Sequence, residues 1–493
     1  MVLKRRIKML LSEILKGVSL SSLLARDCEI EDIIYDSRKA KKDTLFVCLS
    51  GARFDGHDFA EKAYKSGCRT FLCEKEVPLP KDANILVCKN TRAALAVCSK
   101  NFFRDPSSEI AVIGITGTKG KTTVAHIVRA VLEGNGIKCG IIGTIGAKSG
   151  NKVLPTVNTT PESYELQKIL RIMADDGCAA AAIEVSSLGL KHHRVDGVQF
   201  DTAVFTNLSP DHIGTNEHAS FEEYAYWKKQ LFKMCKKAVV NSDDEFSREV
   251  LDVCVCPTVT FGFDKNADFR LIGAKNMKRS GKLGVDFSYI EYGKEKSFFV
   301  SLPGDVNAYN AVCACAVAKS FGVSDESLRK SLSSVYVKGR GEIVETGRDF
   351  SVIIDYAHNG VSLKSIVETI REYETKRIIA VFGSVGGKSE IRRKELGLVA
   401  GAMCDLSIVT SDDPDFEDPE KICREIASYV EEVHGKYVII PDRKKAILYA
   451  LSAAQEGDVV LLAGKGHEEF IKIKGEKLPF SERKIVEEAL NRS

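Results

Sequence analysis

The sequence has no run of 18 apolar residues, so nothing in it is typical of a membrane-spanning helix. It also lacks an excess of either charge, because 71 Lys and Arg against 68 Asp and Glu leave a formal net charge of only +3. This balance argues against nucleic acid or a membrane surface as a partner, and any anionic ligand must be held by local groups. Proline is scarce, with 12 residues against 38 glycines, which argues against long disordered linkers.

Two features bear on the cellular compartment. The 15 cysteines are odd in number and scattered, and the closest pairs, Cys254/Cys256 and Cys313/Cys315, lack the two-residue gap of a zinc knuckle. We therefore expect free buried thiols rather than disulfides. Residues 1–15 have no uninterrupted apolar stretch and no cleavage site, so they are predicted to form a basic amphipathic helix in a cytoplasmic protein.

The length of 493 residues predicts roughly three domains, at about 150 residues for each. A hydrophobic content of 44% and a charged content of 28% are ordinary for globular proteins. We expect one break at the turn-rich segment 104–108 and a second near 338–341. The predicted domains are therefore residues 1–106, 107–338 and 339–493.

Short β-branched runs, each followed by a polar or glycine-rich corner and a helix-like segment, predict an α/β fold with parallel sheets. The clearest runs are Ile110–Thr116, Ala180–Val185, Thr202–Leu208, Ile378–Gly383, Leu406–Thr410 and Asp458–Ala463. A further strand, Ser351–Ile354, is expected after the second break. Parallel sheets carry ligand groups at the carboxyl ends of their strands, so the functional residues are expected at these corners.

The strongest motif is the glycine-rich corner Gly114–Thr123, which lies between a predicted buried strand and a helical segment. Such a corner directs backbone N–H groups at phosphates, with Lys121 on the outer phosphates and Thr122 on Mg²⁺. Ile115 stands where the usual spacing has glycine, so the loop is a variant that begins at Gly117. The predicted ATP-binding residues of this loop are Gly117, Thr118, Lys119, Gly120, Lys121, Thr122 and Thr123.

Two further corners supply candidate metal ligands. Glu184 ends a predicted strand and offers a carboxylate oxygen to Mg²⁺ beside the phosphates, although a glutamate there also serves as a cap or ion-pair partner. His212 closes the corner Thr206–His212, although a single histidine is often a hydrogen-bonded core residue. The convergence of three such corners favours the ligand role for both residues.

In this order, the motifs GTKGKTT, EVSS and TNLSPDH, followed by the segment Tyr224–Phe232, resemble those of the Mur ligases and, within them, the MurE subfamily. Further matching segments are Asn307–Asn310, Gly339–Arg340, Asp355–His358, Gly464–Glu468 and Pro479–Ser481. The resemblance spans nearly the whole chain. It implies an N-terminal UDP-binding α/β domain, a central P-loop ATPase-like domain with a parallel sheet and a C-terminal Rossmann-like domain.

The resemblance also implies an activity, ATP-dependent amide ligation in cytoplasmic peptidoglycan synthesis. Such enzymes join an amino acid to the D-glutamate of UDP-N-acetylmuramoyl-L-Ala-D-Glu through an acyl phosphate that the incoming amine attacks. The expected partners are that UDP-sugar dipeptide, ATP and the amino acid, and the chain is expected to be a monomer. Phosphoryl transfer of this kind needs positioning and charge neutralisation, by Lys121 and two Mg²⁺ ions, more than a protein nucleophile.

By resemblance, the Mg²⁺ ligands are Thr122, Glu184, His212 and Lys228. Lys228 aligns with a lysine that this family carries as a carbamate, since an ammonium would repel Mg²⁺ whereas a carbamate supplies an anionic oxygen. Lys121, Lys228 and His212 are accordingly the predicted catalytic residues. Two alternatives stay open: Lys228 is a solvated helix lysine, or the neighbouring Lys229 takes its place.

The resemblance assigns two further sets of substrate contacts. The UDP-sugar dipeptide is expected to contact Ser37, Thr159, Thr160, Ser186, His192 and Arg194. Without the resemblance, the triplet Asp36-Ser37-Arg38 reads as a turn or helix cap, and some relatives have Gln where His192 stands. The residues expected on the adenosine side of ATP are Asn307, Arg340 and Asp355.

The identity of the added amino acid depends on two stretches. The first, Gly383–Arg393 with Lys388 and Glu390, resembles lysine-adding members, as does Asp355–Gly360, and both predict L-lysine. Members that use meso-diaminopimelate typically have Arg where this sequence has Asp415. The negative charge of Asp415 would repel the second carboxylate of diaminopimelate and attract an ammonium. The residues expected to bind the amino acid are Arg393 (for its α-carboxylate), Asp412, Asp413, Pro414, Asp415, Gly464 and Glu468.

Several alternatives remain. Lysine-adding members commonly have Asn or Ala where Asp415 stands, so ornithine or diaminopimelate stays open, and Asp415 could be a solvated loop acid. A folylpolyglutamate synthetase relative would share the ATPase domain but would need no uridine module such as that suggested by Asp36–Arg38. A nonenzymatic ATP-binding scaffold would have lost its metal ligands, yet Glu184, His212 and Lys228 are all present.

Overall fold

The computed structural model describes residues 8–21, 26–51, 54–211, 213–214, 217–279, 282–387 and 390–491. The chain forms two compact units, which we call unit 1 (Met1–Arg270 with Cys313–Ser327) and unit 2 (Leu271–Val312 with Leu328–Ser493). All 15 cysteines are free thiols, as expected. Within the described ranges, none of the helices has the length and apolar character needed to span a bilayer.

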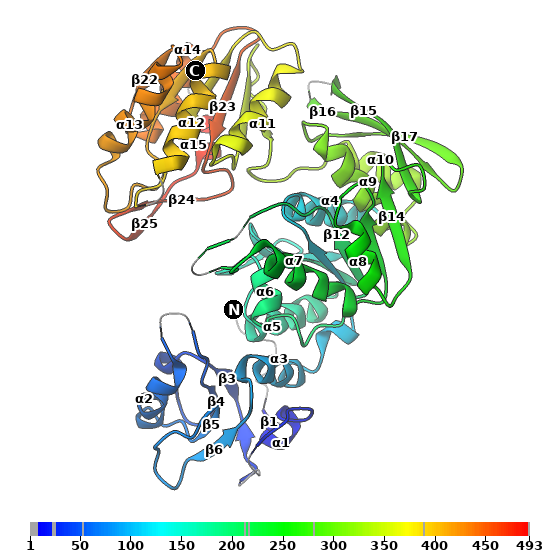
Figure 1. The fold of residues 1–493 in the computed structure, drawn as a ribbon, viewed down its shortest axis with the longest axis vertical. Coiled ribbons are helices and arrows are strands. Elements are labelled where there is room, and N and C mark those ends of the chain that lie inside the picture. The colour runs from blue at the N-terminus through cyan, green and yellow to red at the C-terminus, as the bar shows by residue number, and fades with distance from the viewer. Residues whose placement is uncertain are drawn as a thin grey trace. The chain divides into compact units, whose positions relative to one another are not determined.

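Unit 1 begins with a four-stranded parallel sheet in the order β3-β4-β5-β6. Its strands are β3 (Asp32–Ile34), β4 (Thr44–Val47), β5 (Thr70–Cys73) and β6 (Asn84–Val87). Alternate residues face opposite sides: Leu45 and Leu72 pack in the cluster of α3 (Thr91–Phe102), and Phe46 and Phe71 pack in that of α2 (Ala60–Lys65). The two helices accordingly lie on opposite sides of these strands (Figure 1).

The helix expected over residues 1–15 is only partly present. Residues 1–7 lie outside the described ranges, and Met9–Leu10 form β1, which pairs antiparallel with β2 (Glu29–Ile30). Helix α1 covers only Leu11–Ile14, and its first and last residues are fully buried. The expectation of a longer helix was wrong because pairing with a distant segment decides the conformation of residues 9 and 10.

The central sheet of unit 1 has the order β10-β9-β8-β11-β7-β12-β13-β14. Three strands were expected, β7 (Ala111–Thr116), β11 (Ala180–Glu184) and β12 (Thr202–Phe205), and all are confirmed as neighbouring parallel strands. The others are β8 (Cys139–Gly143), β9 (Gly146–Ser149), β10 (Lys152–Leu154), β13 (Ala238–Asn241) and β14 (Thr258–Gly262). Parallel strands are buried on both faces, which explains their continuous apolar sequences.

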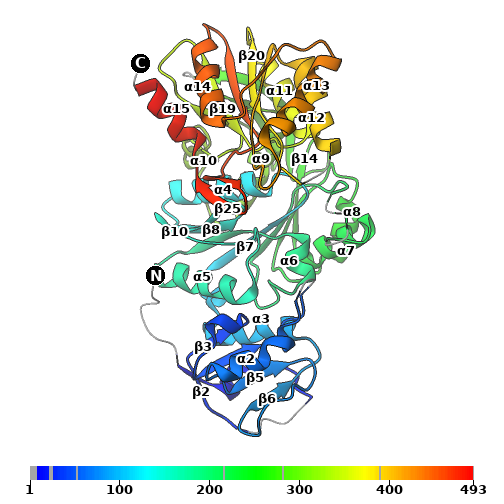
Figure 2. The same ribbon diagram turned by 90° about the vertical axis from the view of Figure 1, so that its left-hand side faces the viewer.

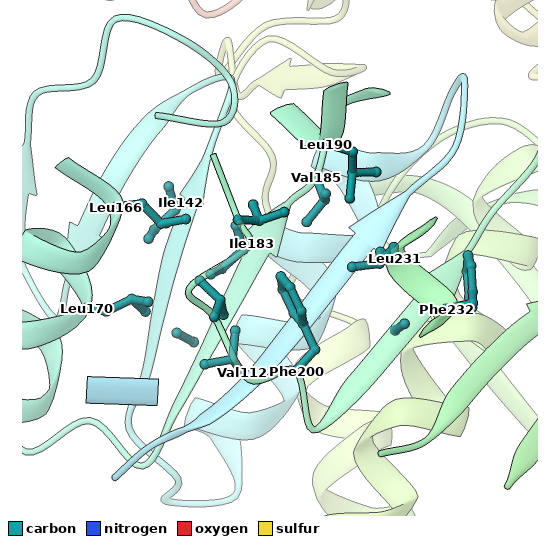
Figure 3. Close-up of a cluster of buried hydrophobic side chains, with 14 of the residues drawn as sticks. Val112, Ile142, Leu166, Leu170, Ile183, Val185, Leu190, Phe200, Leu231 and Phe232 are labelled. Atoms are coloured by element: carbon teal, nitrogen blue, oxygen red, sulfur yellow. The ribbon is translucent and has the colours of Figure 1, made fainter. Parts of the chain in front are cut away.

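Helices cover both faces of this sheet. They are α4 (Lys121–Gly134), α5 (Ser163–Asp175), α6 (Ser187–Lys191), α7 (Phe221–Gln230) and α8 (Ser247–Val253). Figure 2 shows α4 and α5 on opposite sides of β7 and β8. On the α5 side, Ile183, Val185 and Phe200 lie in one buried cluster with Leu231 (Figure 3). A Cβ at Gly114 would lie 2.7 Å from the Phe200 ring, so this glycine lets the ring pack on β7.

Strand β15 (Phe269–Arg279) begins in unit 1 beside β14 and continues into unit 2, where β16 (Lys282–Glu291) and β17 (Lys294–Val300) form an antiparallel pair. The main sheet of unit 2 has the order β18-β19-β23-β20-β21-β22, and all but β18 are parallel. Its strands are β18 (Glu342–Val344), β19 (Ser351–Asp355), β20 (Ile378–Phe382), β21 (Leu406–Val409), β22 (Tyr437–Ile439) and β23 (Val459–Ala463). The four strands expected here are thus confirmed.

The unit 2 sheet is doubly wound, as expected of a Rossmann-like fold. One face packs against α11 (Gly360–Arg371), α12 (Glu390–Met403) and α13 (Pro419–Glu432), and the other against α14 (Arg443–Ala453) and α15 (Glu482–Asn491). The remaining elements are α9 (Val306–Lys319), α10 (Asp325–Leu332) and a hairpin of β24 (Phe470–Ile473) and β25 (Glu476–Pro479).

Both expected breaks are turns with left-handed backbone. Arg104 and Asp105 have φ of 57° and 44° before a 3₁₀ turn at Pro106–Ser108, and Gly339 and Gly341 have φ of 65° and 59°. The α/β class with parallel sheets is confirmed. The boundaries of the three domains stay a prediction.

Candidate functional site

The glycine-rich corner joins β7 to α4 as the sequence predicts. Gly117 has φ of +146°, and a Cβ there would lie 2.0 Å from Oγ1 of Thr206, so only glycine fits. Gly120 has φ of +84° and stands at the N-terminus of α4. Nζ of Lys121 folds back over the corner and donates to the carbonyl oxygens of Gly117 (2.8 Å) and Thr118 (3.0 Å).

The corner after β12 holds this loop in shape. The N–H groups of Thr118 and Lys119 donate to the backbone and side-chain oxygens of Asn207, both at 2.9 Å. Oγ1 of Thr206 donates to the carbonyl of Lys119 at 2.7 Å, and Oγ1 of Thr118 donates to that of Ser209 at 3.1 Å. Two motifs about 90 residues apart in the chain therefore form one structural unit.

Glu184, at the end of β11, is fully buried and faces the start of α4. Its carboxylate accepts from Oγ1 of Thr122 (2.8 Å) and from the N–H (2.9 Å) and Oγ1 (3.1 Å) of Thr144. A Cβ at Gly143 would lie 2.0 Å from Oε1 of Glu184, so glycine makes room for the carboxylate. The sequence analysis missed Thr144, whose only signal is its place after strand β8.

Lys228 lies on α7 with only 2% of its surface exposed, so it is not a solvated helix lysine. Its Nζ donates to the carbonyl of Gly117 at 2.7 Å and lies 4.6 Å from the centroid of the Tyr224 ring. Burial, and secondarily the charge of Lys121, hold the pKa of Lys228 well below its usual value. Lys229, the rival position, instead forms an ion pair with Glu249.

The donor set at this corner fits a hard divalent cation, because Thr122 and Glu184 bring a hydroxyl and a carboxylate together at 2.8 Å. Nζ of Lys228 reaches the same loop at the carbonyl of Gly117. His212, the fourth expected ligand, lies outside the described residues. Its expected role stays a prediction.

Four of the residues expected to contact the peptide form one hydrogen-bond network with Glu184. Oγ1 of Thr160 donates to the carbonyl of Glu184 (2.9 Å) and accepts from the N–H of Ser186 (2.9 Å). Arg194 donates to the carbonyl of Thr160 at 3.1 Å. Oγ1 of Thr159 lies 3.1 Å from that of Thr144, which binds Glu184 in turn.

Glu162, which the sequence analysis missed, orients Arg194. It accepts from Nε of Arg194 at 2.7 Å and from Arg92 of α3 at 3.3 Å.

Burial, followed by the charges of Arg92 and Arg194, lowers the pKa of His192 to about 4, so this imidazole is neutral at pH 7.

Ser37 is buried at the start of a 3₁₀ turn, Ser37–Lys39, which follows β3. The carboxylate of Asp36 caps this turn by accepting from the N–H of Arg38 at 3.0 Å and also binds the Arg38 side chain. Asp36 therefore has the capping role that the sequence also allowed, and Arg38 is its partner. Ser37 remains the predicted UDP contact.

The residues expected on the adenosine side lie in unit 2. The carboxylate of Asp355, at the end of β19, accepts from the N–H of Gly341 at 2.7 Å, and burial raises its pKa. The Arg340 guanidinium lies 5.0 Å from the Tyr356 ring centroid, and its buried Nε has no hydrogen-bond partner in the described part of the protein. Asn307 donates to the carbonyl of Pro303 at 2.8 Å.

Unit 2 also contains a cavity of about 240 Å³ at the carboxyl ends of its strands. Its lining combines three carboxylates with aromatic, hydroxyl and basic groups: Tyr356, His358, Ser384, Val385, Arg392, Asp412, Asp413, Gly464 and Glu468. Asp412, Asp413, Gly464 and Glu468 were expected here. Pro414 follows the cavity residues Asp412 and Asp413 in the chain. Its carbonyl oxygen packs against Gly386, where a Cβ would lie only 2.0 Å away.

A fully buried lysine, Lys465, joins these carboxylates. Its Nζ lies 2.8 Å from Asp413, 2.6 Å from Glu468 and 3.6 Å from Asp412. Burial opposes its charge, but the three carboxylates raise its pKa above the usual value. Three negative groups around one cation leave the cavity acidic, which suits an amino acid with ammonium groups.

Two expected contacts of the amino acid are engaged elsewhere in the structure. Arg393 has 3% of its surface exposed and forms ion pairs with Glu417 and Glu425, both at 2.6 Å, whereas its neighbour Arg392 lines the cavity. Asp415 forms an ion pair with Lys472 at 2.5 Å. Their roles in binding stay predictions, and Lys388 lies outside the described residues, as does the side chain of Glu390.

Comparisons with known proteins agree with the resemblance. The sequence matches three family models, described as Mur ligase family, catalytic domain (29–118), Mur ligase middle domain (115–318) and Mur ligase, glutamate ligase domain (339–466). It is 42% identical to the UDP-N-acetylmuramoyl-L-alanyl-D-glutamate--2,6-diaminopimelate ligase of Caldanaerobacter subterraneus subsp. tengcongensis, over 98% of this chain and 100% of that one. It is 38% identical to the enzyme of the same name from Clostridium botulinum, over 97% and 99%.

A solved structure shares the fold over the same extent. The structure of a UDP-N-acetylmuramoyl-L-alanyl-D-glutamate--2,6-diaminopimelate ligase superposes with a TM-score of 0.71 at 26% sequence identity. The match covers 99% of both chains.

Proposed function

Because the chain belongs to the Mur ligase family, we propose that it joins an amino acid to the D-glutamate of UDP-N-acetylmuramoyl-L-Ala-D-Glu with consumption of ATP. The observation that carries this proposal is the phosphate-binding corner, in which Gly117, Lys121, Thr122 and Glu184 lie together as phosphoryl transfer requires. The resemblance of the whole chain to ligases acting on this UDP-sugar dipeptide supports the acceptor.

The residues of unit 1 have distinct roles in this reaction. Lys121 neutralises charge on the outer phosphates, and Thr122 and Glu184 are the residues that would hold Mg²⁺ together with Lys228 as its carbamate. Mg²⁺ supplies charge neutralisation at the phosphoryl group that moves to the substrate carboxylate. Arg194, oriented by Glu162, pairs with an acidic group of the peptide, and neutral His192 beside it accepts or donates a hydrogen bond without adding charge.

Lys228 reacts with CO₂ through its neutral amine. Nζ forms an N–C bond to the carbon of CO₂ and releases one proton to solvent, which leaves an anionic carbamate. The lowered pKa of Lys228 supports this step, because only the unprotonated amine carries the required lone pair. A carbamate at this position would supply an anionic oxygen to Mg²⁺, which an ammonium would repel.

We propose 2,6-diaminopimelate as the amino acid in place of the L-lysine expected from residues 383–393. The similar ligases are named for diaminopimelate, and the acidic cavity of unit 2 suits either diamino acid. Our expectation against diaminopimelate rested on repulsion by Asp415, but Lys472 balances that charge. Arg392 lies on the cavity wall and supplies a positive charge for one of the two carboxylates of diaminopimelate.

Purified protein supplied with ATP and the UDP-dipeptide tests both proposals through phosphate release. Release that requires the UDP-dipeptide and a diamino acid supports the ligase, and dependence on folate and glutamate would refute it. In a competition among meso-diaminopimelate, L-lysine and L-ornithine, we expect diaminopimelate to have the highest kcat/KM. A preference for lysine would restore the first expectation.

A further inference from the structure

Three potential metal ligands from separate parts of the sequence meet in the first part of unit 1. Cys48 and Cys73 lie at the carboxyl ends of the adjacent parallel strands β4 and β5, in which Val47 pairs with Leu72. Their Sγ atoms are 3.5 Å apart. One ligand atom of His57 and the two Sγ atoms all lie within 4.8 Å of one another. Both cysteines are fully buried and His57 is 6% exposed.

The imidazole of His57 is held in one orientation. Asp55 caps the 3₁₀ turn Gly56–Phe59 by accepting from the N–H of His57 at 3.0 Å, and its Oδ1 lies 2.5 Å from Nδ1 of the ring. Lys75 binds the other carboxylate oxygen at 2.9 Å, which keeps Asp55 ionised. Nδ1 therefore carries the proton, and Nε2 is an acceptor that takes the N–H of Glu74 at 2.9 Å. A carboxylate behind a histidine ring is a common support for metal ligation.

We propose that Cys48, His57 and Cys73 bind a thiophilic divalent metal ion, of which Zn²⁺ is the best match, through both Sγ atoms and Nε2. Two thiols and one imidazole nitrogen are the donor set of sites with three protein ligands, in which water takes the fourth position of a tetrahedron. On binding, each thiol releases its proton to solvent, and Nε2 exchanges the N–H of Glu74 for the metal.

Charge balance favours a divalent ion over a monovalent one. Two thiolates, a neutral imidazole and one M²⁺ ion have a net charge of zero, which lowers the cost of burying the site. The hydrogen bond with Cys73 and burial raise the pKa of the Cys48 thiol. Cys68, also nearby, donates to the carbonyls of Thr44 (3.2 Å) and Thr70 (3.3 Å) and is not part of the site.

The position of the site predicts its effect. The site lies at the carboxyl end of the sheet formed by β3 to β6, the same end at which Ser37 follows β3. It joins the ends of β4 and β5 to the turn that carries His57. Metal binding would stabilise this end of the sheet, and its ligands are not residues of the phosphate-binding corner. The proposal is therefore independent of the proposed ligase activity.

Cobalt titration of the full-length protein, reduced and freed of metal with a chelator, tests the site. We expect one thiolate-bound Co²⁺ per chain, with a thiolate-to-cobalt charge-transfer band and tetrahedral ligand-field bands that Zn²⁺ removes. Cys48→Ser and Cys73→Ser should each abolish the charge-transfer band. The matched control is Cys256→Ser, which disrupts the other close pair, Cys235 and Cys256 (3.5 Å), and should leave the spectrum unchanged.

Asp55→Asn provides a second test that leaves both thiols intact, in case a serine variant does not fold. It should weaken Zn²⁺ binding about 10- to 100-fold and reduce the rise in melting temperature that Zn²⁺ produces in the unaltered protein. The proposal is wrong if the unaltered protein shows no thiolate band, if Cys256→Ser removes that band, or if Asp55→Asn binds Zn²⁺ with unchanged affinity.

Discussion

The two units each bury a lysine at the carboxyl ends of parallel strands, but the two lysines differ in their partners. Lys228 in unit 1 donates to the carbonyl of Gly117, and the charge of Lys121 adds to the effect of burial in lowering its pKa. Lys465 in unit 2 contacts three carboxylates, which raise its pKa despite its complete burial.

Burial alone therefore does not decide the charge of a lysine in this protein. Around Lys228, burial and the charge of Lys121 favour the neutral amine, which is the nucleophile that carbamate formation needs. Lys465 contacts three carboxylates, so it keeps its proton, and its positive charge offsets the repulsion among these carboxylates. The following experiments test this difference, from the largest expected effect to the smallest.

Lys465→Met should have the largest effect on stability. It leaves Asp412, Asp413 and Glu468 close together without their shared cation, so the free energy of unfolding should fall by about 3–5 kcal/mol. Urea denaturation followed by circular dichroism measures this change. Lys228→Met is the matched control and should not lower the free energy of unfolding, because burial and the charge of Lys121 already disfavour the ammonium of Lys228. Equal losses in the two variants would contradict the comparison.

Lys228→Ala should reduce the rate of phosphate release by about 10²–10³-fold, the usual loss when one preorganised electrostatic group is removed. Acetate should restore part of the activity by supplying the missing carboxylate oxygen. Lys229→Ala, which removes only an ion pair with Glu249, should stay within about twofold of the unaltered protein. An absence of rescue by acetate would count against the carbamate.

The dependence of stability on pH should have opposite signs for the two lysines. The pKa of Lys228 is lower in the folded protein, so between that lowered pKa and 10.5 the unfolded chain binds more protons, and stability rises with pH over this range by at most about 1.4 kcal/mol per unit. The pKa of Lys465 is raised, so its contribution is present below 10.5 and is lost at higher pH. Urea midpoints across this range, compared with those of Lys228→Met and Lys465→Met, measure each contribution. An unchanged slope in Lys228→Met would mean that Lys228 is charged.

Asp415→Asn should have the smallest effect. Because Lys472 already balances this carboxylate, the preference between diaminopimelate and lysine should shift toward diaminopimelate by no more than about fivefold. Lys472→Met is the paired variant and should shift the preference the other way, since it leaves Asp415 unbalanced. A shift above tenfold in Asp415→Asn would show that Asp415 itself selects the substrate.

Local patterns were sufficient to predict the elements of the phosphate-binding corner. A strand ending at Thr116, a glycine-rich turn and a helix starting at Lys121 are encoded within about ten residues, and all are found. Glu184 was predictable because strand-end residues in parallel sheets face the ligand edge. Thr144 has the same position after β8, but threonine after a strand is too common to stand out.

Residues that act through distant partners could not be predicted in this way. Glu162 gains its role only from Arg92 and Arg194, which lie 70 and 32 positions away. The choice between Arg392 and Arg393 depends on which side of α12 faces Glu417 and Glu425, and the sequence motif favoured Arg393. Cys48 and Cys73 lie 25 positions apart, so their spacing gave no sign that they meet across β4 and β5.

The sequence by itself determined the α/β class, the strands and the glycine-rich corner, because hydrophobic runs, glycines and capping residues act through neighbours in the chain. Only the tertiary structure decided the electrostatics of the two lysines. A pKa depends on the groups within a few ångströms of a charge, and the three-dimensional fold brings Gly117 to Lys228 and two aspartates to Lys465 across long stretches of chain.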